Sequence, residues 1–131
     1  VNPVYDDVVK EIISFFAERL QKTSSLGIKD IIIDPGFGFG KTIEHNFQLL
    51  KGLKAFSVFE LPVMAGLSRK SMIYKSLGIS SDEALNGTTV LNTLALLNGV
   101  NLLRVHDVKE AKEVLKLFMA YKAGGEGGSN W

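Results

Sequence analysis

The segment that most constrains the fold is a run of three isoleucines, residues 31–33, followed at once by the glycine-rich loop of residues 34–41, DPGFGFGK. Three β-branched residues in a row are typical of a strand buried on both faces, as in parallel sheets. The glycines then predict a tight turn, and a helical pattern begins after Thr42. In α/β proteins a carboxylate such as Asp34, at the carboxyl end of a buried strand, marks a place where ligands bind. The segment therefore predicts both a parallel sheet and a candidate site.

Hydrophobic spacing predicts that helices and strands alternate along the chain. Asn2 and Pro3 are expected to cap and begin a long amphipathic helix that ends near Gly27, with Asp6 and Asp7 in its first turn. Strands are expected over residues 30–33, 62–65 and 102–105. The remaining helices are expected around Phe47, Leu50 and Leu53; over residues 70–77; from a capping box of Ser80 and Glu83 to about Gly99; and after a cap at Asp107, with Ala111, Val114, Leu115 and Phe118 on the apolar face.

This order of elements predicts an α/β fold of parallel β/α units with right-handed helical crossovers. Three strands cannot close a barrel, and a full (β/α)8 barrel needs about 250 residues. A chain of 131 residues therefore corresponds to about half of such a barrel. A small open α/β domain is the alternative that the pattern leaves open. The folded part is expected over residues 1–123, and the glycine-rich tail of residues 124–131 is expected to be disordered.

Composition narrows the classes of function. The formal net charge is +1 and no basic cluster stands out, so neither nucleic acid nor a membrane is expected as a partner. The absence of cysteine excludes disulfides and thiolate metal sites and is compatible with the cytoplasm, where we expect the protein. We find no signal peptide and no apolar run long enough to span a bilayer. Because the first residue is Val1 rather than methionine, we expect a fragment or a processed product.

Polar residues follow all three predicted strands. Asp34 follows the first, the Ser-Arg-Lys group of residues 68–70 follows the second, and Arg104 and His106 stand at the end of the third. Because the carboxyl ends of parallel strands lie at one edge of a sheet, these side chains are expected to meet. An arginine and a histidine beside a helix N-terminus would suit a phosphate group. The alternatives are a solvated strand end with Asp107 as a helix cap, and basic residues that merely begin a surface helix.

The glycine loop misses the two nucleotide-binding motifs by one position each. A P-loop, G-x-x-x-x-G-K-[ST], would end at residues 40–42 but needs a glycine where Pro35 stands. The Rossmann pattern G-x-G-x-x-G fails because Gly40 comes one residue too early. A simple tight turn is the other interpretation, but it leaves Asp34 as a costly carboxylate without a partner. His45 is expected on the exposed side of its helix rather than in a site.

Three segments together resemble the dihydropteroate synthases in order and spacing: residues 34–41, residues 66–71 (GLSRKS) and residues 104–108 (RVHDV). The resemblance extends from Tyr5 to about Lys122 and implies the carboxyl-terminal half of a TIM (β/α)8 barrel. The activity it implies is the condensation of 6-hydroxymethyl-7,8-dihydropterin diphosphate with 4-aminobenzoate. That reaction gives dihydropteroate for folate synthesis and releases diphosphate.

The resemblance also implies a role for each matched residue. Asp34 would accept two parallel hydrogen bonds from the pterin ring, a geometry that suits a carboxylate, and Lys70 would donate to the carbonyl edge of the ring. The 4-aminobenzoate site is the one that sulfonamides occupy in this family. The implied sets are Asp34, Phe37, Met64, Gly66 and Lys70 for the pterin; Gly38, Phe39 and Ser68 for 4-aminobenzoate; Arg104 and His106 for the diphosphate; and Lys70, Arg104 and His106 for catalysis.

Parts of the family pattern are missing from this sequence. They include a magnesium-linked asparagine, an aspartate and an asparagine that grip the pterin, and two flexible loops. Mg²⁺ is therefore an expected cofactor of the parent protein with no ligand in this chain, and the chain alone is expected to be inactive. The expected partners are the two small substrates and either a second copy of the chain, as a homodimer, or the missing half barrel.

Other interpretations compete with the synthase. The pterin-binding domain of methyltetrahydrofolate methyltransferases shares the pterin carboxylate but binds no diphosphate, so Arg104 and His106 favour the synthase. A non-catalytic half barrel that associates with itself or with the missing half is supported by its unpaired strand edges. A P-loop nucleotide-binding domain is disfavoured by Pro35.

Overall fold

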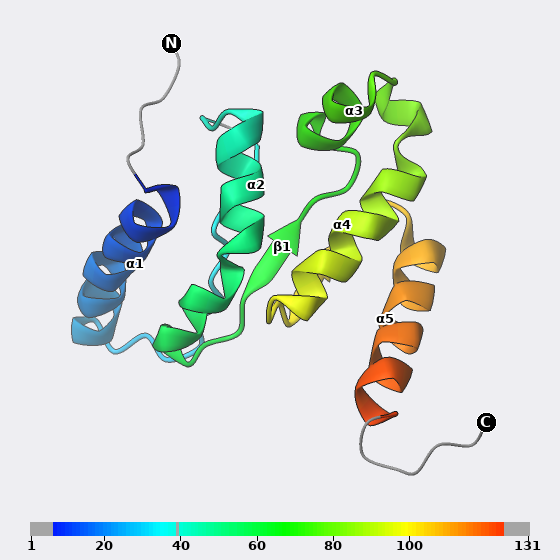
Figure 1. Cartoon of the computed structure of the whole chain (residues 1–131). Coiled ribbons are helices and arrows are strands. Elements are labelled where there is room, and N and C mark those ends of the chain that lie inside the picture. The colour runs from blue at the N-terminus through cyan, green and yellow to red at the C-terminus, as the bar shows by residue number, and fades with distance from the viewer. Residues whose placement is uncertain (1–6, 39, 125–131) are drawn as a thin grey trace.

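The computed structural model of the chain describes residues 7–38 and 40–124 (Figure 1). The expected cap at Asn2 and the expected first-turn position of Asp6 lie outside the described residues. Helix α1 covers Val8–Ser25, so the prediction that Asp7 lies inside the first turn is wrong. Asp7 is instead the N-cap, and its carboxylate accepts a hydrogen bond from the Lys10 amide at 3.1 Å.

The remaining elements alternate much as the spacing predicts, but two boundaries differ. Leu53 belongs to a separate 3-10 turn rather than to the second helix. The capping box of Ser80 and Glu83 is present, yet it begins a 3-10 turn, and the long helix starts after it. Residues 125–131 of the expected disordered tail lie outside the described residues. The elements are α2 (Ile43–Lys51), η1 (Leu53–Phe59), β1 (Met64–Gly66), α3 (Ser71–Leu77), η2 (Ser81–Glu83), α4 (Leu85–Leu97), β2 (Leu102–Arg104) and α5 (Val108–Ala123).

The sheet is parallel, as predicted, but shorter than predicted. β1 pairs with β2 in a register that sets Met64 beside Leu102 and Gly66 beside Arg104. The expected first strand is reduced to a single bridge, in which the Ile33 amide donates to the Pro62 carbonyl at 2.9 Å and the Ile33 carbonyl accepts from the Met64 amide at 2.7 Å. All three segments still run in the same direction.

Helices cover one face of this sheet. Figure 1 shows the helices side by side in chain order from α1 to α5, with β1 between α2 and α4 in this view. Ile33, Val63 and Ala65 are buried beneath them, whereas Ile32 is 51% exposed and Leu102 39% exposed. The prediction that the isoleucine strand is buried on both faces is therefore wrong for this chain. Successive strand side chains alternate between faces, and within the described residues only one face has a helical layer on it.

The helix interfaces correct two further expectations. On α2 it is Asn46 that is buried, while Phe47 is 38% exposed, and on α5 Leu115 is exposed where Ala111 and Val114 are buried.

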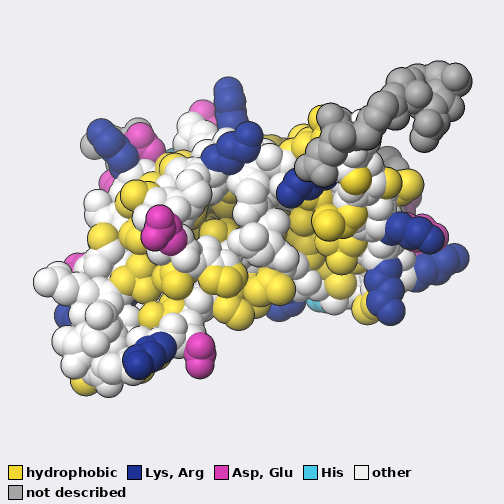
Figure 2. All heavy atoms as spheres, turned by 90° about the horizontal axis from the view of Figure 1, so that it is seen from below, with side chains coloured by type: hydrophobic (Ala, Val, Ile, Leu, Met, Phe, Trp, Pro, Cys, Tyr) yellow, Lys and Arg dark blue, Asp and Glu magenta, His cyan; other side chains and the backbone are white. Residues whose placement is uncertain are grey.

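Figure 2 shows yellow hydrophobic side chains spread over the middle of the face that it views, with most lysines and arginines around its outline. Among the described residues, no helix is both long enough and apolar enough to cross a membrane.

The contact between α3 and α4 depends on a residue without a side chain. A Cβ atom at Gly87 would press against Cγ2 of Ile73, which is buried and, being β-branched, stiff. Gly87 therefore lets the two helices approach closely. It lies in the first turn of α4, although glycine is otherwise unfavourable in a helix.

Replacing Gly87 by alanine should destabilise the chain, although alanine favours a helix over glycine by about 1 kcal/mol. Overpacking a core typically costs about 1–3 kcal/mol, so we expect a net loss of about 1 kcal/mol in the free energy of unfolding, measured by urea denaturation. Asn86→Ala is the matched control on the exposed neighbouring position, where only helix propensity should act. A Gly87→Ala variant more stable than the native chain would contradict the close packing.

Candidate functional site

The carboxyl ends of the strands meet, as predicted, and two of their charged residues form an ion pair. Asp34 directly follows the Ile33 bridge and Arg104 ends β2, and Arg104 Nη1 donates to Asp34 Oδ2 at 3.0 Å. The other carboxylate oxygen, Oδ1, accepts from the Gly36 amide at 3.0 Å. The side chains of Arg104 and Asp34 are 60% and 31% exposed, so the pair lies at the surface.

Arg104 extends across the neighbouring strand. A Cβ atom at Gly66 would lie 2.5 Å from Arg104 Nη2, and Arg104 Nη1 is 3.9 Å from the sulfur of Met64. Any larger residue at position 66 would displace the guanidinium. The structure thus brings together Asp34, Met64, Gly66 and Arg104, for which the family resemblance implies contacts with the pterin and the diphosphate.

Lys70 connects the second strand end to the glycine loop. Its Nζ donates to the Phe37 carbonyl oxygen at 2.7 Å, and its Cδ would lie 3.6 Å from a Cβ atom at Gly38. Gly38 has φ +100°, which a residue with a side chain adopts only at a cost. The Phe37 side chain is packed in the hydrophobic core, so its backbone rather than its ring faces Lys70. Phe39 lies outside the described residues.

A buried asparagine, which the sequence analysis missed, holds the glycine loop. Asn46 Oδ1 accepts from the Gly38 amide at 2.8 Å, and Asn46 Nδ2 donates to the Thr42 carbonyl at 3.0 Å. Thr42 caps α2, and His45, expected to be exposed, is half-buried and accepts from the Thr42 amide through Nδ1 at 3.4 Å. The sequence feature that indicates these hydrogen bonds is an asparagine at an inward-facing position of a predicted helix, because a buried polar side chain needs a partner.

Two links join the loop after β1 to the loop after β2. Ser68 Oγ accepts from the His106 amide at 3.1 Å, and Ser68 is buried whereas His106 is exposed. Arg69 forms a two-pronged ion pair with Asp107, with nitrogen–oxygen distances of 3.0 and 3.1 Å. The prediction that the Asp107 side chain caps α5 is wrong: Asp107 stands at the N-cap position, but its carboxylate binds Arg69 and makes no capping hydrogen bond.

The pKa values of the two lysines near Asp34, Lys41 and Lys70, respond to burial and to neighbouring charges of both signs. Burial lowers the pKa of Lys41, while the nearby Asp34 carboxylate raises it. Burial also lowers the pKa of Lys70, the neighbouring Arg104 and Lys41 lower it further, and Asp34 raises it. Among the described residues, Asp34 is the one carboxylate that acts on Lys41, Lys70 and Arg104, an arrangement with more positive than negative charge and thus suited to an anion.

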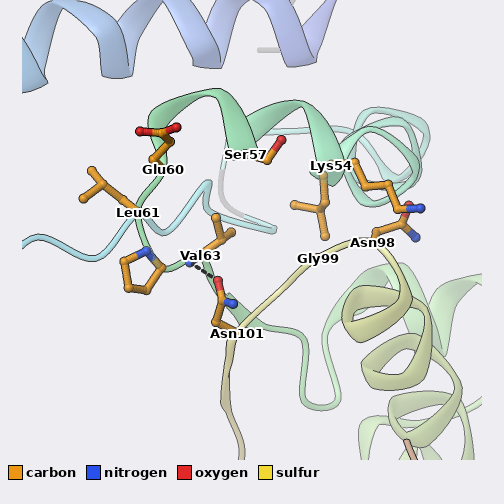
Figure 3. Close-up of a pocket in the computed structure, with 10 residues that line it drawn as sticks. Lys54, Ser57, Glu60, Leu61, Val63, Asn98, Gly99 and Asn101 are labelled. Carbon is orange, nitrogen blue, oxygen red and sulfur yellow. Dashed lines mark hydrogen bonds between the residues drawn. The ribbon is translucent and has the colours of Figure 1, made fainter. Parts of the chain in front are cut away.

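No group of three or more acidic, histidine or cysteine side chains in the part of the chain that the structure describes could hold a metal ion. A hollow of about 710 Å³ exists elsewhere, at the opposite ends of the strands (Figure 3). It lies where Asn101 Oδ1 accepts from the Val63 amide at 2.9 Å, before β2 and β1 begin, with Lys54, Ser57 and Glu60 around it. This hollow is separate from the charged strand ends.

Two substitutions should move the pKa of Lys70 in opposite directions. Asp34→Asn should lower the pKa values of Lys70 and Lys41, because the carboxylate that favours their charged forms is lost. Arg104→Ala should raise the pKa of Lys70, because a repelling cation is removed. NMR titration of the two lysine side chains measures both shifts, with the exposed Lys116 as an internal reference. Shifts of the same sign in the two variants would contradict this electrostatic arrangement.

Comparison with known proteins agrees with this geometry. Residues 1–106 match the model of the family described as pterin binding enzyme. The dihydropteroate synthase of Escherichia coli is 41% identical over 120 residues, which are 90% of this chain and 43% of that protein.

Solved structures of the same kind of enzyme superimpose closely. The Yersinia pestis dihydropteroate synthase has a TM-score of 0.91 and 37% identity, covering 94% of this chain and 51% of that chain. The Xanthomonas albilineans dihydropteroate synthase, solved with 4-aminobenzoic acid, has a TM-score of 0.89 and 40% identity, covering 94% of this chain and 48% of that one. The chain thus spans about half the length of these relatives, which fits the interpretation as half of a TIM barrel rather than a separate small fold. With a match that covers most of its length, the chain belongs to the family of pterin-binding enzymes.

Proposed function

We propose that the protein to which this chain belongs is a dihydropteroate synthase, which joins 6-hydroxymethyl-7,8-dihydropterin diphosphate to 4-aminobenzoate. The observation that carries the proposal is the convergence of Asp34, Lys70 and Arg104 from three successive strand ends. Arg104 Nη1 lies 3.0 Å from Asp34 Oδ2, and Lys70 Nζ lies 2.7 Å from the Phe37 carbonyl oxygen in the glycine loop that follows Asp34. The Asp34 carboxylate can accept paired hydrogen bonds from a planar ring, and it lies beside cations that can bind a diphosphate. The identity to named synthases supports it.

Substrate binding on this proposal exchanges one internal ion pair for two external contacts. Arg104 now covers Met64 and Gly66, where the pterin ring is expected, and holds Asp34. An exposed pair of this kind is worth about 0–1 kcal/mol, whereas hydrogen bonds to a charged group are worth about 1.5–3 kcal/mol each. The pterin therefore competes successfully for Asp34, and the freed Arg104 turns to the diphosphate.

The chemical step follows from the charges. The amine nitrogen of 4-aminobenzoate attacks the methylene carbon of the pterin, the bond from that carbon to the diphosphate oxygen breaks, and the amine loses a proton. Because negative charge builds up on the departing diphosphate, cations fixed beside it lower the barrier. We assign this role to Arg104 and His106, and we assign contact with the pterin carbonyl to Lys70.

For 4-aminobenzoate we propose the surface near Gly38, Phe39 and Ser68, and sulfonamides would compete there. Ser68 supports this in one respect: its Oγ accepts from the His106 amide, so its hydroxyl proton is not used in that hydrogen bond, although the side chain is buried in this chain. Among solved relatives, the Xanthomonas albilineans enzyme was determined with 4-aminobenzoic acid.

Magnesium and the protein partners also belong to the proposal. Because the described residues include no cluster that could hold a metal, Mg²⁺ would need ligands outside them. The exposed Ile32 and Leu102 on the uncovered sheet face support pairing with the missing half of the barrel. A homodimer in the cytoplasm is the arrangement we propose for the parent protein. The methyltransferase alternative is less well supported, because a domain that binds no diphosphate has no evident use for Arg104 at this position.

The proposed site can be tested by calorimetry with two ligands, the dihydropterin diphosphate and the same pterin without its diphosphate. Asp34→Asn should weaken the binding of both by about 1.5–3 kcal/mol, because the charged acceptor is lost. Arg104→Ala should weaken only the diphosphate form. For the free pterin it should leave affinity unchanged or improve it by up to about 1 kcal/mol, because the competing partner of Asp34 is gone.

Arg19→Ala, which removes an exposed arginine that stacks on Phe15, is the matched control and should change neither affinity. Equal affinity of Asp34→Asn and native chain would refute the pterin assignment. If the folded native chain binds neither ligand, this half barrel carries no preformed site.

The chain by itself should produce no dihydropteroate at a useful rate, because it spans only about half the length of the synthases it resembles and one face of its sheet is uncovered. The measurement is conversion of labelled 4-aminobenzoate, with the Escherichia coli enzyme as a positive control. Sustained turnover by the purified 131-residue chain would contradict the expectation.

A further inference from the structure

Arg69 donates hydrogen bonds through its backbone amide and through all three nitrogens of its guanidinium group. Its guanidinium donates to both carboxylate oxygens of Asp107, at 3.0 and 3.1 Å, and to the carbonyl oxygens of Ser81 and Asp82, at 2.9 and 2.6 Å. Its amide donates to Oγ1 of Thr88, a buried residue of α4, at 3.0 Å. One residue of the loop before α3 therefore binds the turn η2, helix α4 and the start of α5.

The backbone of Arg69 supports the same conclusion. Its φ is +54°, in the left-handed region that residues other than glycine seldom occupy. Such a conformation persists only where surrounding contacts hold it, and it recurs at functional sites. Here the contacts are the five hydrogen bonds just described. Four come from the guanidinium group and one from the backbone amide, so both the side chain and the backbone of Arg69 are held in place.

The position of Arg69 in the chain gives these contacts a consequence for the site. Ser68 and Lys70 are its immediate neighbours, and Asp107 immediately follows His106. The Arg69–Asp107 pair and the hydrogen bond from the His106 amide to Ser68 Oγ run in parallel between the same two loops. Together they set how far Lys70 lies from Arg104 and His106.

We propose that Arg69 is a positioning residue that holds the loop bearing Ser68 and Lys70 in register with the loop bearing Arg104 and His106. The proposal rests on the proposed function for what these loops bind, whereas the link between them is a property of the chain itself. Arg69 touches no substrate in this assignment. Its side chain and that of Asp107 are only 24% and 23% exposed, so water screens this pair less than it screens the pair of Arg104 with Asp34.

A lysine cannot replace this arginine. A single ammonium group lacks the planar fork that binds two carboxylate oxygens and two carbonyl oxygens at once. Arg69→Lys should therefore behave like Arg69→Ala in every measurement below, which a role limited to local charge does not predict.

The test uses the 131-residue chain and inorganic pyrophosphate as the probe. Arg69→Ala, Arg69→Lys and Asp107→Asn should each weaken pyrophosphate binding by about tenfold or more, measured well below the melting temperature. Each should also speed hydrogen exchange at the His106 amide relative to amides in the middle of α4. The Arg69→Ala, Asp107→Asn double variant should be no weaker than the single variants within about twofold, because one link is broken in all three.

Two exposed residues provide matched controls, Arg19→Ala for the arginine and Asp30→Asn for the aspartate, and neither should alter binding or exchange. Variants that lower only the melting temperature, with pyrophosphate affinity and His106 exchange unchanged, would overturn the proposal. So would a rescue of both by Arg69→Lys. If the native chain does not bind pyrophosphate, the proposed anion site is refuted for this chain, and the exchange measurement decides alone whether Arg69 links the loops.

Discussion

The parallel pairing of β1 with β2 is the constraint on which the candidate site depends. Its register sets Gly66 beside Arg104, so the guanidinium lies over a residue without a side chain and reaches Asp34, 70 positions away in the sequence. A slip of one residue would turn Arg104 toward the face that the helices cover. A ladder of three residues per strand thus determines which charges meet.

The same sheet explains why this chain is incomplete as a barrel. Helices bury one face, while Ile32 and Leu102 remain exposed on the other. Burying such a side chain fully is worth about 1.5–3 kcal/mol, so the open face has a substantial tendency to acquire a cover. In the Yersinia pestis relative, to which 94% of this chain corresponds, the matched region is 51% of a longer chain. On the proposed function, the rest of such a longer chain is our candidate for this cover.

The loops of the candidate site are held by neutral hydrogen bonds and by the Arg69–Asp107 ion pair rather than by the exposed pair of Arg104 with Asp34. Asn46 fixes the glycine loop, Ser68 fixes the amide of His106, and Arg69 with Asp107 ties the last two loops together. These groups are at least partly shielded from water, so their contacts are screened less than the exposed pair of Arg104 with Asp34. On the proposed function, Asp34 and Arg104 would exchange partners while these contacts hold the loops in place.

The sequence alone determined the alternation of elements, the parallel sheet and the meeting of Asp34, Lys70 and Arg104 at one edge, because each follows from local periodicity and from the common direction of parallel strands. It did not determine that Ile32 would be exposed or that Asp107 would bind Arg69 instead of capping its helix. Those outcomes depend on which layers cover a strand and which polar groups come within about 3 Å once the helices are packed. Local spacing carries no information on either, so only the tertiary structure decided them.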